Sequence, residues 1–387
     1  MSALDLGNHT LPYGIFRPAG LAPRVGVGVR NLVLDLSRFI DSPDEFAQTT
    51  LNPFMAQGRA RWHEVRKLVQ QRVTAGVHAE QADVHAIDDV ELLMPIDVAD
   101  FVDFFSGIEH AVNMGRILRP EDADPLKPNY RSLPVGYHGR AGTVIPSGSE
   151  VVRPEGQVLT AGGPMLAQSE RLDIEAELGY VVGTPSDRGN PVPADKFRDH
   201  VFGVLILIDW SARDIQSWEY QPLGPFLAKS FATTISNWVV PLEALDETGC
   251  TAGPAQSPPV LTYLDVPEPR NHAIQLEIEL NGTVLSHPHS AGLYWSPAQQ
   301  LAHMTRNGAS LRTGDLYGTG TISSSDANAM GSLMEITWGG ATEIRLLDGS
   351  TRRFLQDDDE LVIRAWIAGD PHRSLGEARG RIRPRVE

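Results

Sequence analysis

Short runs in which apolar and polar residues alternate, separated by glycines and prolines, recur along most of the chain. Examples are LDIEAELGYVVG, HAIQLEIELNGTVLS, GSLMEITWGG and ELVIRAWIAG. Alternation of this kind is typical of strands that bury one face. The sequence contains no fixed repeat, no heptad pattern and no low-complexity tail. The pattern therefore predicts a mainly β fold with some helices, of the α+β class, in which sheets pack or roll around one core.

The N-terminal part of the chain has a different pattern. Within residues 11–40, segments such as RVGVGVRNLVLDLS predict two or three short strands of a small β unit. Apolar residues then recur at helical spacing, namely Trp62, Val65, Val69 and Val73. Because arginines and lysines fill the other face, this segment predicts an amphipathic helix. The stretch VELLMPIDVAD is interpreted as the passage into a second unit, so we expect an N-terminal domain over residues 1–94 and a larger β domain over residues 95–387.

The composition narrows the classes of partner. Of 387 residues, 41% are hydrophobic, and acidic residues exceed basic ones by 49 to 33, a formal charge of -16. Such a charge disfavours nucleic acid and anionic membrane as partners and favours a hard cation. Cys250 is the only cysteine, which excludes an intrachain disulfide and a thiolate metal cluster. The start resembles no secretory leader, and the longest apolar stretch, residues 201–208, is too short to span a bilayer, so we expect a cytoplasmic protein.

Three acidic residues alternate with apolar residues in RLDIEAELGY, namely Asp173, Glu175 and Glu177. In a strand this spacing directs all three carboxylates to one face, where neighbours lie about 6 to 7 Å apart and repel one another. A solvated acidic face is the simplest interpretation of any one of them. Clustered carboxylates, however, are usually stabilised by a divalent cation with oxygen ligands, either catalytic or as a structural calcium site in a binding protein.

A further acid, Asp209, directly follows the apolar run VFGVLILI. The pattern predicts a buried strand that ends in a carboxylate. A charge at that point destabilises the fold unless it is paired, so we expect a metal or another cation close to it. The alternative is an aspartate that caps the next helix, although Ser211 is the better cap.

The segment after Asp209 predicts a helix. Ser211 and Asp214 have capping-box spacing, which places the helix start at about Ala212. Residues spaced by three and four share one face of this helix, namely Arg213, Gln216 and Tyr220. A guanidinium, an amide and a phenol on one face suit a substrate with carbonyl and carboxylate oxygens, and a solvated helix face is the alternative.

A candidate base occurs in DFVDFFSGIEHAVNMG. Ser106 and Glu109 again have capping-box spacing, so a helix is expected to begin at Gly107 with His110 in its first turn. A helix N-terminus disfavours imidazolium, which would help His110 to stay neutral and accept a proton. Asp103 lies just upstream, within reach of the same site. A structural histidine is the alternative.

Several other chemistries lack their motifs. The chain has neither H-E-x-x-H nor G-x-S-x-G, which argues against zincin and serine-hydrolase chemistry. LGPFLAKS lacks the glycine that a phosphate loop needs before Lys229, and GVGVRN lacks the third glycine of a dinucleotide fingerprint. Nucleotide binding therefore has no support.

Six segments occur in the order in which one enzyme family has them. They are DFVDFFSGIEHAVNMG, LPVGYHGRAGTV, RLDIEAELGYVVG, DWSARDIQSWEYQPLGPFLAKSFATTIS, LRTGDLYGTGTISSSD and GSLMEITWGG. These segments resemble the fumarylacetoacetase family, and the block from Asp209 to Ser236 is the most specific. The resemblance covers most of residues 95–387, and the N-terminal part is similar to that of the full-length eukaryotic-type enzymes.

The resemblance implies a homodimer in which a small SH3-like N-terminal β domain precedes a large mixed β-sandwich roll. It also implies metal-dependent hydrolysis of the carbon–carbon bond of 4-fumarylacetoacetate to fumarate and acetoacetate, the last step of tyrosine and phenylalanine degradation. The alternative in the same superfamily is a hydrolase, decarboxylase or isomerase of another diketo acid, of the acylpyruvate or oxaloacetate type. Many of those proteins lack the N-terminal domain and the SGIEHAVNMG helix.

Roles for individual residues follow from the same resemblance. It implies a catalytic Ca2+ or Mg2+ bound by Asp103, Glu175, Glu177 and Asp209. It implies His110 as the base, oriented by Glu335, and an oxyanion stabilised by Arg213, Gln216 and Lys229. Substrate contacts are implied at Phe105, Arg119, Tyr137, Gln216, Tyr220 and Thr321. A second cation, Mg2+, is implied near Asp209, Lys229 and Thr233. Asp173 is not implied as a ligand, and we expect it to pair with a base or to face water.

Phe105 is the one visible departure from the family pattern, because relatives often have tyrosine at this position. One phenol contact to the substrate would then be missing. We expect the difference to act on affinity or substrate range and to leave the base and the metal ligands unaffected.

Overall fold

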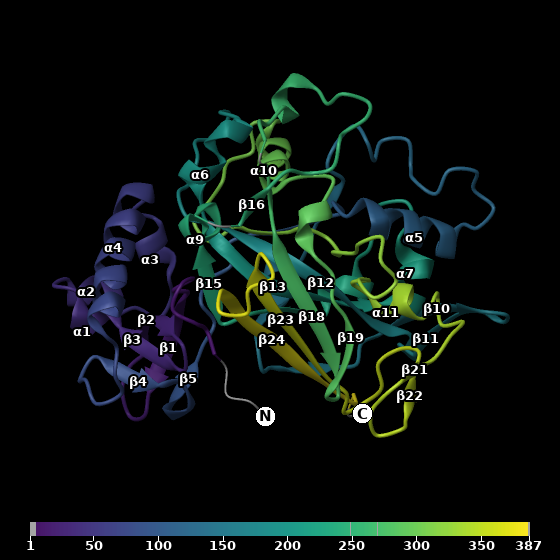
Figure 1. Cartoon of the computed structure of the whole chain (residues 1–387). Coiled ribbons are helices and arrows are strands. Elements are labelled where there is room, and N and C mark those ends of the chain that lie inside the picture. The colour runs from purple at the N-terminus through teal and green to yellow at the C-terminus, as the bar shows by residue number, and fades with distance from the viewer. Residues whose placement is uncertain (1–4, 248, 269, 386–387) are drawn as a thin grey trace.

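The computed structural model describes residues 5–247, 249–268 and 270–385. A small unit formed by the N-terminal segment lies beside a much larger one, as Figure 1 shows. Within the described residues, no helix combines the length and the apolar character needed to cross a bilayer.

The small N-terminal unit is a β-sheet with helices packed on it. Its strands are β1 (Tyr13–Pro18), β2 (Arg24–Val29), β3 (Leu32–Asp35), β4 (Val84–Ala86) and β5 (Val90–Leu92). Its helices are α1 (Leu36–Phe39), α2 (Pro43–Phe46), α3 (Asn52–Met55) and α4 (Arg59–Ala75). The predicted strands and the predicted amphipathic helix are confirmed, since Trp62, Val65 and Val69 of α4 join the core of this unit. Arg66 departs from the predicted basic face, because its guanidinium is buried and donates to a backbone carbonyl.

A large central sheet runs through the rest of the chain. Its strands are β6 (Phe101–Phe104), β7 (Gly136–His138), β8 (Val144–Pro146), β12 (Leu172–Val182), β13 (Val201–Ala212), β14 (Thr233–Ile235), β15 (Trp238–Pro241) and β20 (Leu316–Gly318). The strand order β4-β3-β2-β1-β15-β13-β12-β20-β6-β7 shows that the small sheet continues into the central one through β1 and β15. A boundary between residues 94 and 95 therefore stays a prediction.

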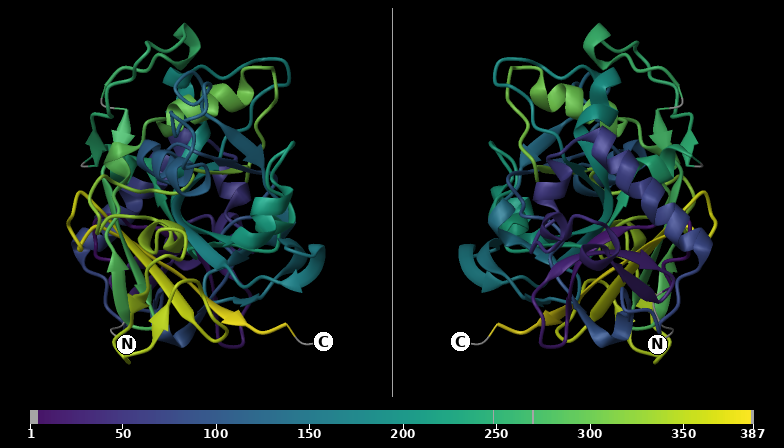
Figure 2. Two further views of the ribbon diagram at one scale, coloured as in Figure 1. Left: turned by 90° about the vertical axis from the view of Figure 1, so that its right-hand side faces the viewer. Right: turned by 90° about the vertical axis from the view of Figure 1, so that its left-hand side faces the viewer.

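A second sheet packs face to face on the central one. It consists of β19 (Thr283–Ser286), β18 (Ile274–Leu280), β23 (Glu360–Ile367), β24 (Ser374–Arg383) and β9 (Glu150–Val152). Apolar side chains from both sheets form one core, and the two views in Figure 2 show the sheets as layers. The expected α+β sandwich is therefore confirmed.

Short hairpins and helices complete the larger unit. The hairpins are β10 (Glu155–Thr160) with β11 (Gly163–Gln168) and β21 (Ile344–Arg345) with β22 (Thr351–Arg352). A further two-stranded antiparallel sheet pairs β16 (Cys250–Thr251) with β17 (Asn271–His272). The helices are α5 (Ile108–Leu118), α6 (Phe197–His200), α7 (Arg213–Glu219), α8 (Leu227–Ser230), α9 (Leu242–Asp246), α10 (Pro297–Thr305) and α11 (Leu333–Ile336).

Both faces of β12 and β13 are buried, and this burial positions the site. On one face, alternate residues such as Ile174 of β12 and Ile206 of β13 enter the core between the sheets. On the other face of β13, Leu205 and Leu207 pack against the N-terminal unit, and the next residue on that face is Asp209. Because side chains alternate along a strand, the acidic positions of β12 lie on that same second face. The carboxylates are therefore buried and not solvated, which excludes an exposed acidic strand face.

Candidate metal centre and active site

Four carboxylates from three strands of the central sheet meet at one point. Glu175 of β12 is the register partner of Asp209 of β13, and Glu177 lies two residues further along β12. The parallel pairing of β20 with β6 places Gly318 beside Asp103. One carboxylate oxygen from each acid lies within 4.8 Å of those of the other three, and all four residues are buried. The four predicted ligands are thus brought together.

These carboxylates have acceptor capacity that the protein does not use. Asp103 Oδ1, Glu177 Oε1 and Asp209 Oδ1 are buried and have no hydrogen-bond partner among the described residues. Buried polar atoms are normally paired, and hard divalent cations prefer clustered carboxylate oxygens. The donor set therefore fits a Ca2+ or Mg2+ ion.

The charged side chains around the four carboxylates also indicate a cation site. Lys229 Nζ lies 3.0 Å from Glu175 Oε1 and 2.5 Å from Asp209 Oδ2. Burial raises the pKa of Glu175, but the charges of Lys229 and Arg213 outweigh that effect and lower its pKa below the ordinary value.

The charge of Lys229 also lowers the pKa of Asp103 and Glu177, but other effects outweigh it there. Burial, followed by the charge of Asp209, raises the pKa of Asp103 well above its usual range. Burial and the charge of Asp103 do the same to the pKa of Glu177. The side chains of this protein thus supply too little positive charge for the cluster, and a bound divalent cation would supply the rest.

Gly318 is required where the carboxylates approach β20. A Cβ at this position would lie 2.6 Å from Asp103 Oδ1 and 2.7 Å from Glu177 Oε2. Only a residue without a side chain leaves room for both oxygens. Sequence analysis did not single out Gly318, because one glycine in a glycine-rich chain carries no local signal.

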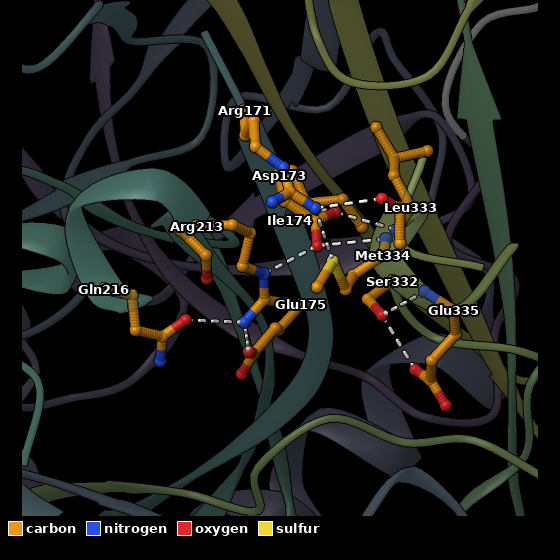
Figure 3. Close-up of polar contacts among 12 residues, drawn as sticks. Arg171, Asp173, Ile174, Glu175, Arg213, Gln216, Ser332, Leu333, Met334 and Glu335 are labelled. Atoms are coloured by element: carbon orange, nitrogen blue, oxygen red, sulfur yellow. Dashed lines mark hydrogen bonds and ion pairs between the residues drawn. The ribbon is translucent and has the colours of Figure 1, made fainter. Parts of the chain in front are cut away.

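Asp173 does not join the four-carboxylate cluster. It is fully buried and pairs with Arg213, whose Nε lies 2.8 Å from Asp173 Oδ2. Of the two expectations for Asp173, pairing with a base is confirmed and facing water is wrong. Figure 3 shows that Arg213 also reaches Glu175, at 2.7 Å, and Gln216, at 3.0 Å. Arg213 and Gln216 therefore do share one side of α7, as predicted.

The candidate base and its partner form a buried pair. His110, in the first turn of α5, has its Nδ1 2.7 Å from Oε2 of Glu335, which lies on α11. Asn113 donates to the other oxygen of Glu335 at 3.0 Å, and the hydroxyls of Ser323 and Ser332 donate to Oε2 at 2.9 and 2.8 Å. Burial raises the pKa of Glu335, but His110, Asn113 and Ser332 outweigh that effect and lower the pKa. Glu335 is therefore held as a carboxylate with a fixed orientation.

Asn113, Ser323 and Ser332 were not predicted as site residues. Asn113 follows His110 by three positions, so helical spacing could have suggested that the two side chains share a face of α5. The two serines lie in two of the segments that resemble the family, but nothing in their spacing links them to Glu335 as donors. Only their positions around Glu335 in the folded chain identify them.

Both predicted capping boxes are wrong. Helix α5 begins at Ile108 after Gly107 with no side-chain cap, because the hydroxyl of Ser106 accepts a hydrogen bond from Gln300. Ser211 lies inside β13, which continues to Ala212, so Asp209 stands within a strand and not at its end. Asp209 therefore caps no helix.

Asp214 is occupied elsewhere. Its carboxylate accepts hydrogen bonds from the hydroxyl of Ser169 and from the N–H of Glu170, so the start of α7 has no side-chain cap. The helix position was predicted correctly, but the local reason for it was not.

Only some of the predicted substrate-contacting residues are placed by their contacts near the carboxylates or His110. Tyr137 Oη lies 3.3 Å from Asp209 Oδ2, and burial raises the pKa of this phenol well above its usual range. The Phe105 ring packs edge-on against the His110 ring, with centroids 5.3 Å apart. Thr321 is buried, and its hydroxyl has no partner among the described residues.

Two other predicted contacts lie further out. Tyr220 directly follows α7 and accepts a hydrogen bond from the neighbouring Gln221. Arg119 follows the end of α5, where its guanidinium is held by Asp122 and by the backbone carbonyl of Pro125. Neither residue is placed against the carboxylates by these contacts.

A cavity of about 310 Å³ opens beside Asp209, one of the four carboxylates. Its lining includes Tyr137, Asp209, Lys229 and Thr233. Thr233 is the register partner of Asp209 in the β13–β14 ladder. All three residues of the predicted second cation site, Asp209, Lys229 and Thr233, line this cavity.

Two family models match the chain. The model for "Fumarylacetoacetase N-terminal" matches residues 9–95, and that for "Fumarylacetoacetate (FAA) hydrolase C-terminal" matches residues 101–383. The fumarylacetoacetase of Arabidopsis thaliana is 40% identical, over 99% of this chain and 98% of that protein. The fumarylacetoacetase of Homo sapiens is 39% identical, over 98% of this chain and 96% of that protein.

Solved structures share the fold at low identity. A fumarylacetoacetate hydrolase from Exiguobacterium antarcticum aligns with a TM-score of 0.57 at 17% identity, over 97% of this chain and 100% of that chain. The maleylpyruvate hydrolase from Sphingobium sp. SYK-6, in complex with manganese (II) and pyruvate, aligns with a TM-score of 0.54 at 13% identity, over 97% and 100% of the two chains.

Proposed function

This chain belongs to the fumarylacetoacetase family, and we propose that it hydrolyses the carbon–carbon bond of 4-fumarylacetoacetate to fumarate and acetoacetate. The observation that carries the proposal is the buried His110–Glu335 pair beside four clustered carboxylates. The two parts adjoin, because Ser332 forms a β-bridge with Glu175 and its hydroxyl donates to Glu335 at 2.8 Å. The reaction would be the last step of tyrosine and phenylalanine degradation.

The reaction forms one bond and breaks another. The oxygen of water bonds to the carbonyl carbon next to the fumaryl double bond, and the bond from that carbon to the acetoacetate methylene then breaks. The electron pair leaves with the acetoacetate fragment as an enolate, which takes up a proton. When bound, a divalent cation would polarise the carbonyl oxygens of this 1,3-diketone.

His110 is proposed as the base that takes the proton from water. Because Glu335 engages Nδ1, the nitrogen left for proton transfer is Nε2. The carboxylate of Glu335 would fix this tautomer and stabilise the imidazolium as it forms. The same Nε2–H could then deliver the proton to the leaving enolate.

Three side chains are proposed to stabilise the tetrahedral oxyanion, namely Arg213, Gln216 and Lys229. Arg213 Nη2 is buried and has no partner among the described residues, so it can donate to a substrate oxygen. The Lys229 ammonium already contacts Glu175 and Asp209 and adds positive charge next to the cavity. Contacts to the rest of the substrate are proposed for Phe105, Arg119, Tyr137, Gln216, Tyr220 and Thr321.

For the catalytic cation we propose Ca2+ or Mg2+, held by Asp103, Glu175, Glu177 and Asp209. A donor set made only of carboxylate oxygens suits both ions. A divalent ion and a keto acid together in the maleylpyruvate hydrolase of similar fold support this type of site. A second Mg2+ is proposed near Asp209, Lys229 and Thr233. Because an ammonium group cannot ligate a cation, Lys229 would contribute to that site through its backbone only.

A homodimer and a cytoplasmic location are proposed from the family resemblance, with a small diketo acid as the partner molecule. Exposed apolar side chains gather on the β10–β11 hairpin and on the segment around α8, namely Leu159, Leu166, Leu223 and Phe226. Exposed apolar surface of this kind supports the proposal that a second subunit packs on it. The division into domains at residues 1–94 and 95–387 is likewise proposed.

The function is tested by mixing the purified protein with fumarylacetoacetate and following the loss of its conjugated absorbance, with and without a chelator. We expect turnover that the chelator abolishes and added Ca2+ or Mg2+ restores. An acylpyruvate and oxaloacetate serve as competing substrates in the same assay. Turnover of one of these, with none of fumarylacetoacetate, would contradict the proposal and favour the superfamily alternative.

A further inference from the structure

Asp173 is the acidic residue of β12 that lies outside the four-carboxylate cluster, and its bonding is saturated. Oδ2 accepts hydrogen bonds from Arg213 Nε at 2.8 Å and from the N–H of Met334 at 3.1 Å. Oδ1 accepts from the N–H groups of Leu333 and Ile174, both at 2.7 Å. A carboxylate offers about four acceptor sites, so the capacity of Asp173 is fully used. Figure 3 shows Asp173 between its partners.

These partners belong to two parts of the proposed active site that are far apart in sequence. Arg213 begins α7, whereas Leu333 begins α11, the helix that carries Glu335. Glu335 in turn contacts His110 at 2.7 Å. One carboxylate on a central strand therefore ties the start of α7 to the start of α11.

Asp173 also decides which edge of the Arg213 guanidinium is left free. Nε is bound by Asp173, and Nη1 is bound by Glu175 at 2.7 Å and by Gln216 at 3.0 Å. Nη2 is the buried nitrogen of this group that has no partner among the described residues. Because a guanidinium is a rigid planar fork, fixing two of its nitrogens fixes the direction of the third.

The segment that leads into α11 has further support. The N–H of Ala176 donates to the carbonyl of Gly331 at 2.9 Å, and Ser332 forms a β-bridge with Glu175. Loss of the Asp173 carboxylate would therefore shift α11 without detaching it from β12. A displacement of about 1 Å at a catalytic group is enough to cost roughly 100-fold in rate.

We propose that Asp173 is a positioning residue that fixes Arg213 and the helix bearing Glu335 relative to each other. The oxyanion donor Arg213 and the base His110 then face the same substrate. The inference rests on the proposed function for the roles of Arg213 and His110. It assigns Asp173 no contact with substrate or cation.

The first test is Asp173→Asn, assayed with fumarylacetoacetate at saturating cation. The amide is nearly isosteric with the carboxylate, but its NH2 group would face N–H donors where the carboxylate oxygen accepts hydrogen bonds. We expect kcat to fall about 100-fold, KM to change less than about threefold, and the Kd for Ca2+ to stay within about threefold of wild type. Asp173→Glu, which keeps the charge and displaces it, should show the same kcat loss and serves if the amide variant does not fold. A folded variant of either kind with kcat close to wild type would overturn the proposal.

A double-mutant cycle separates positioning from a general loss of stability. If Asp173 acts in part through Glu335, then Asp173→Asn should lower single-turnover rates clearly less in the Glu335→Gln background than in wild type. A purely structural role predicts that the two losses multiply. Multiplicative losses would therefore reject the proposal.

Asp35 provides a matched control. It is fully buried, caps α1 by accepting from the N–H of Ser37, and pairs with Arg24 at 3.2 Å, but it belongs to the N-terminal unit. Asp35→Asn should lower the midpoint of thermal unfolding to an extent comparable with Asp173→Asn and leave kcat unchanged. An equal kcat loss in the control would show that stability alone explains the effect and would overturn the assignment.

A readout without substrate keeps the proposed function and this inference distinguishable. The Nδ1 proton that His110 shares with Glu335 is expected to give a far-downfield proton resonance, which His110→Gln removes and so identifies. Asp173→Asn should shift or abolish this resonance and Asp35→Asn should not. Failure of wild-type turnover would reject the function only, whereas an unchanged resonance in Asp173→Asn would reject the role of Asp173.

Discussion

His110 Nδ1 lies 2.7 Å from Glu335 Oε2, although 225 residues separate the two side chains in sequence. Both side chains are buried, and Glu335 also accepts hydrogen bonds from Asn113, Ser323 and Ser332. Because Glu335 engages Nδ1 and is itself held by these donors, Nε2 is the nitrogen of His110 left for proton transfer.

Replacement of either member of this pair should abolish most of the turnover. We expect His110→Ala and Glu335→Gln each to lower kcat by about 100- to 10,000-fold, because proton transfer by a positioned base contributes that much. His303→Gln is the control, since this histidine is half-buried and hydrogen-bonded to Tyr263. Steady-state kinetics measures the effect, and metal content should remain normal. A variant of the pair with wild-type kcat would remove the proposed base.

The cation should stabilise the wild-type protein much more than a variant that lacks one carboxylate. Glu177→Gln removes a carboxylate whose pKa is raised first by burial and then by the charge of Asp103. The amide oxygen of the new glutamine can still accept from the N–H of Gly320. We expect the chelated variant to unfold at a higher temperature than chelated wild type, because repulsion is relieved. Added Ca2+ should raise the unfolding temperature of wild type and have little effect on the variant. Equal shifts in calorimetry would argue against a cation at these residues.

Gly318→Ala should weaken cation binding without changing the fold. The new methyl group would lie 2.6 Å from Asp103 Oδ1 and 2.7 Å from Glu177 Oε2, so both carboxylates would have to move. We expect the Kd for Ca2+ to rise about tenfold or more, given how strongly affinity depends on ligand geometry. Gly142→Ala is the control, because its Cβ position has no heavy atom within 4 Å among the described residues other than its chain neighbours. Isothermal titration calorimetry measures the Kd for Ca2+ of both variants. An unchanged Kd in Gly318→Ala would contradict the prediction.

Stability should depend on pH through His272, which is buried and hydrogen-bonded to Tyr180 at 2.9 Å. Burial lowers the pKa of His272 from 6.5 to about 4. Between these values the unfolded chain binds a proton that the folded chain does not, so stability falls as the pH falls from 6.5 towards 4. The loss attributable to His272 is roughly 3 kcal/mol.

The measurement is denaturant unfolding at several pH values for wild type and His272→Gln. Glutamine does not titrate, so the free energy of unfolding of the variant should fall less steeply in the same window. Parallel curves for the two proteins would show that His272 does not contribute.

Much of this architecture is predictable from sequence, because strand alternation and helical spacing are local patterns. The alternating acids of β12 and the apolar stripe of α4 were both identified from spacing alone, and the order of the motifs indicated the family. The patterns fail where a side chain finds a distant partner. Ser106 was predicted to cap α5 but is bonded to Gln300, and Asp209 was expected at a strand end but lies inside β13.

The sequence by itself therefore determined that Asp173, Glu175 and Glu177 would share one face of a strand. Only the tertiary structure decided that Asp209 lies across the ladder from Glu175 and that Asp103 arrives from β6. It also turned Asp173 away from the cluster and onto Arg213. The physical reason is that spacing fixes the direction of a side chain relative to its own strand, whereas its partners depend on which strands and helices pack beside it.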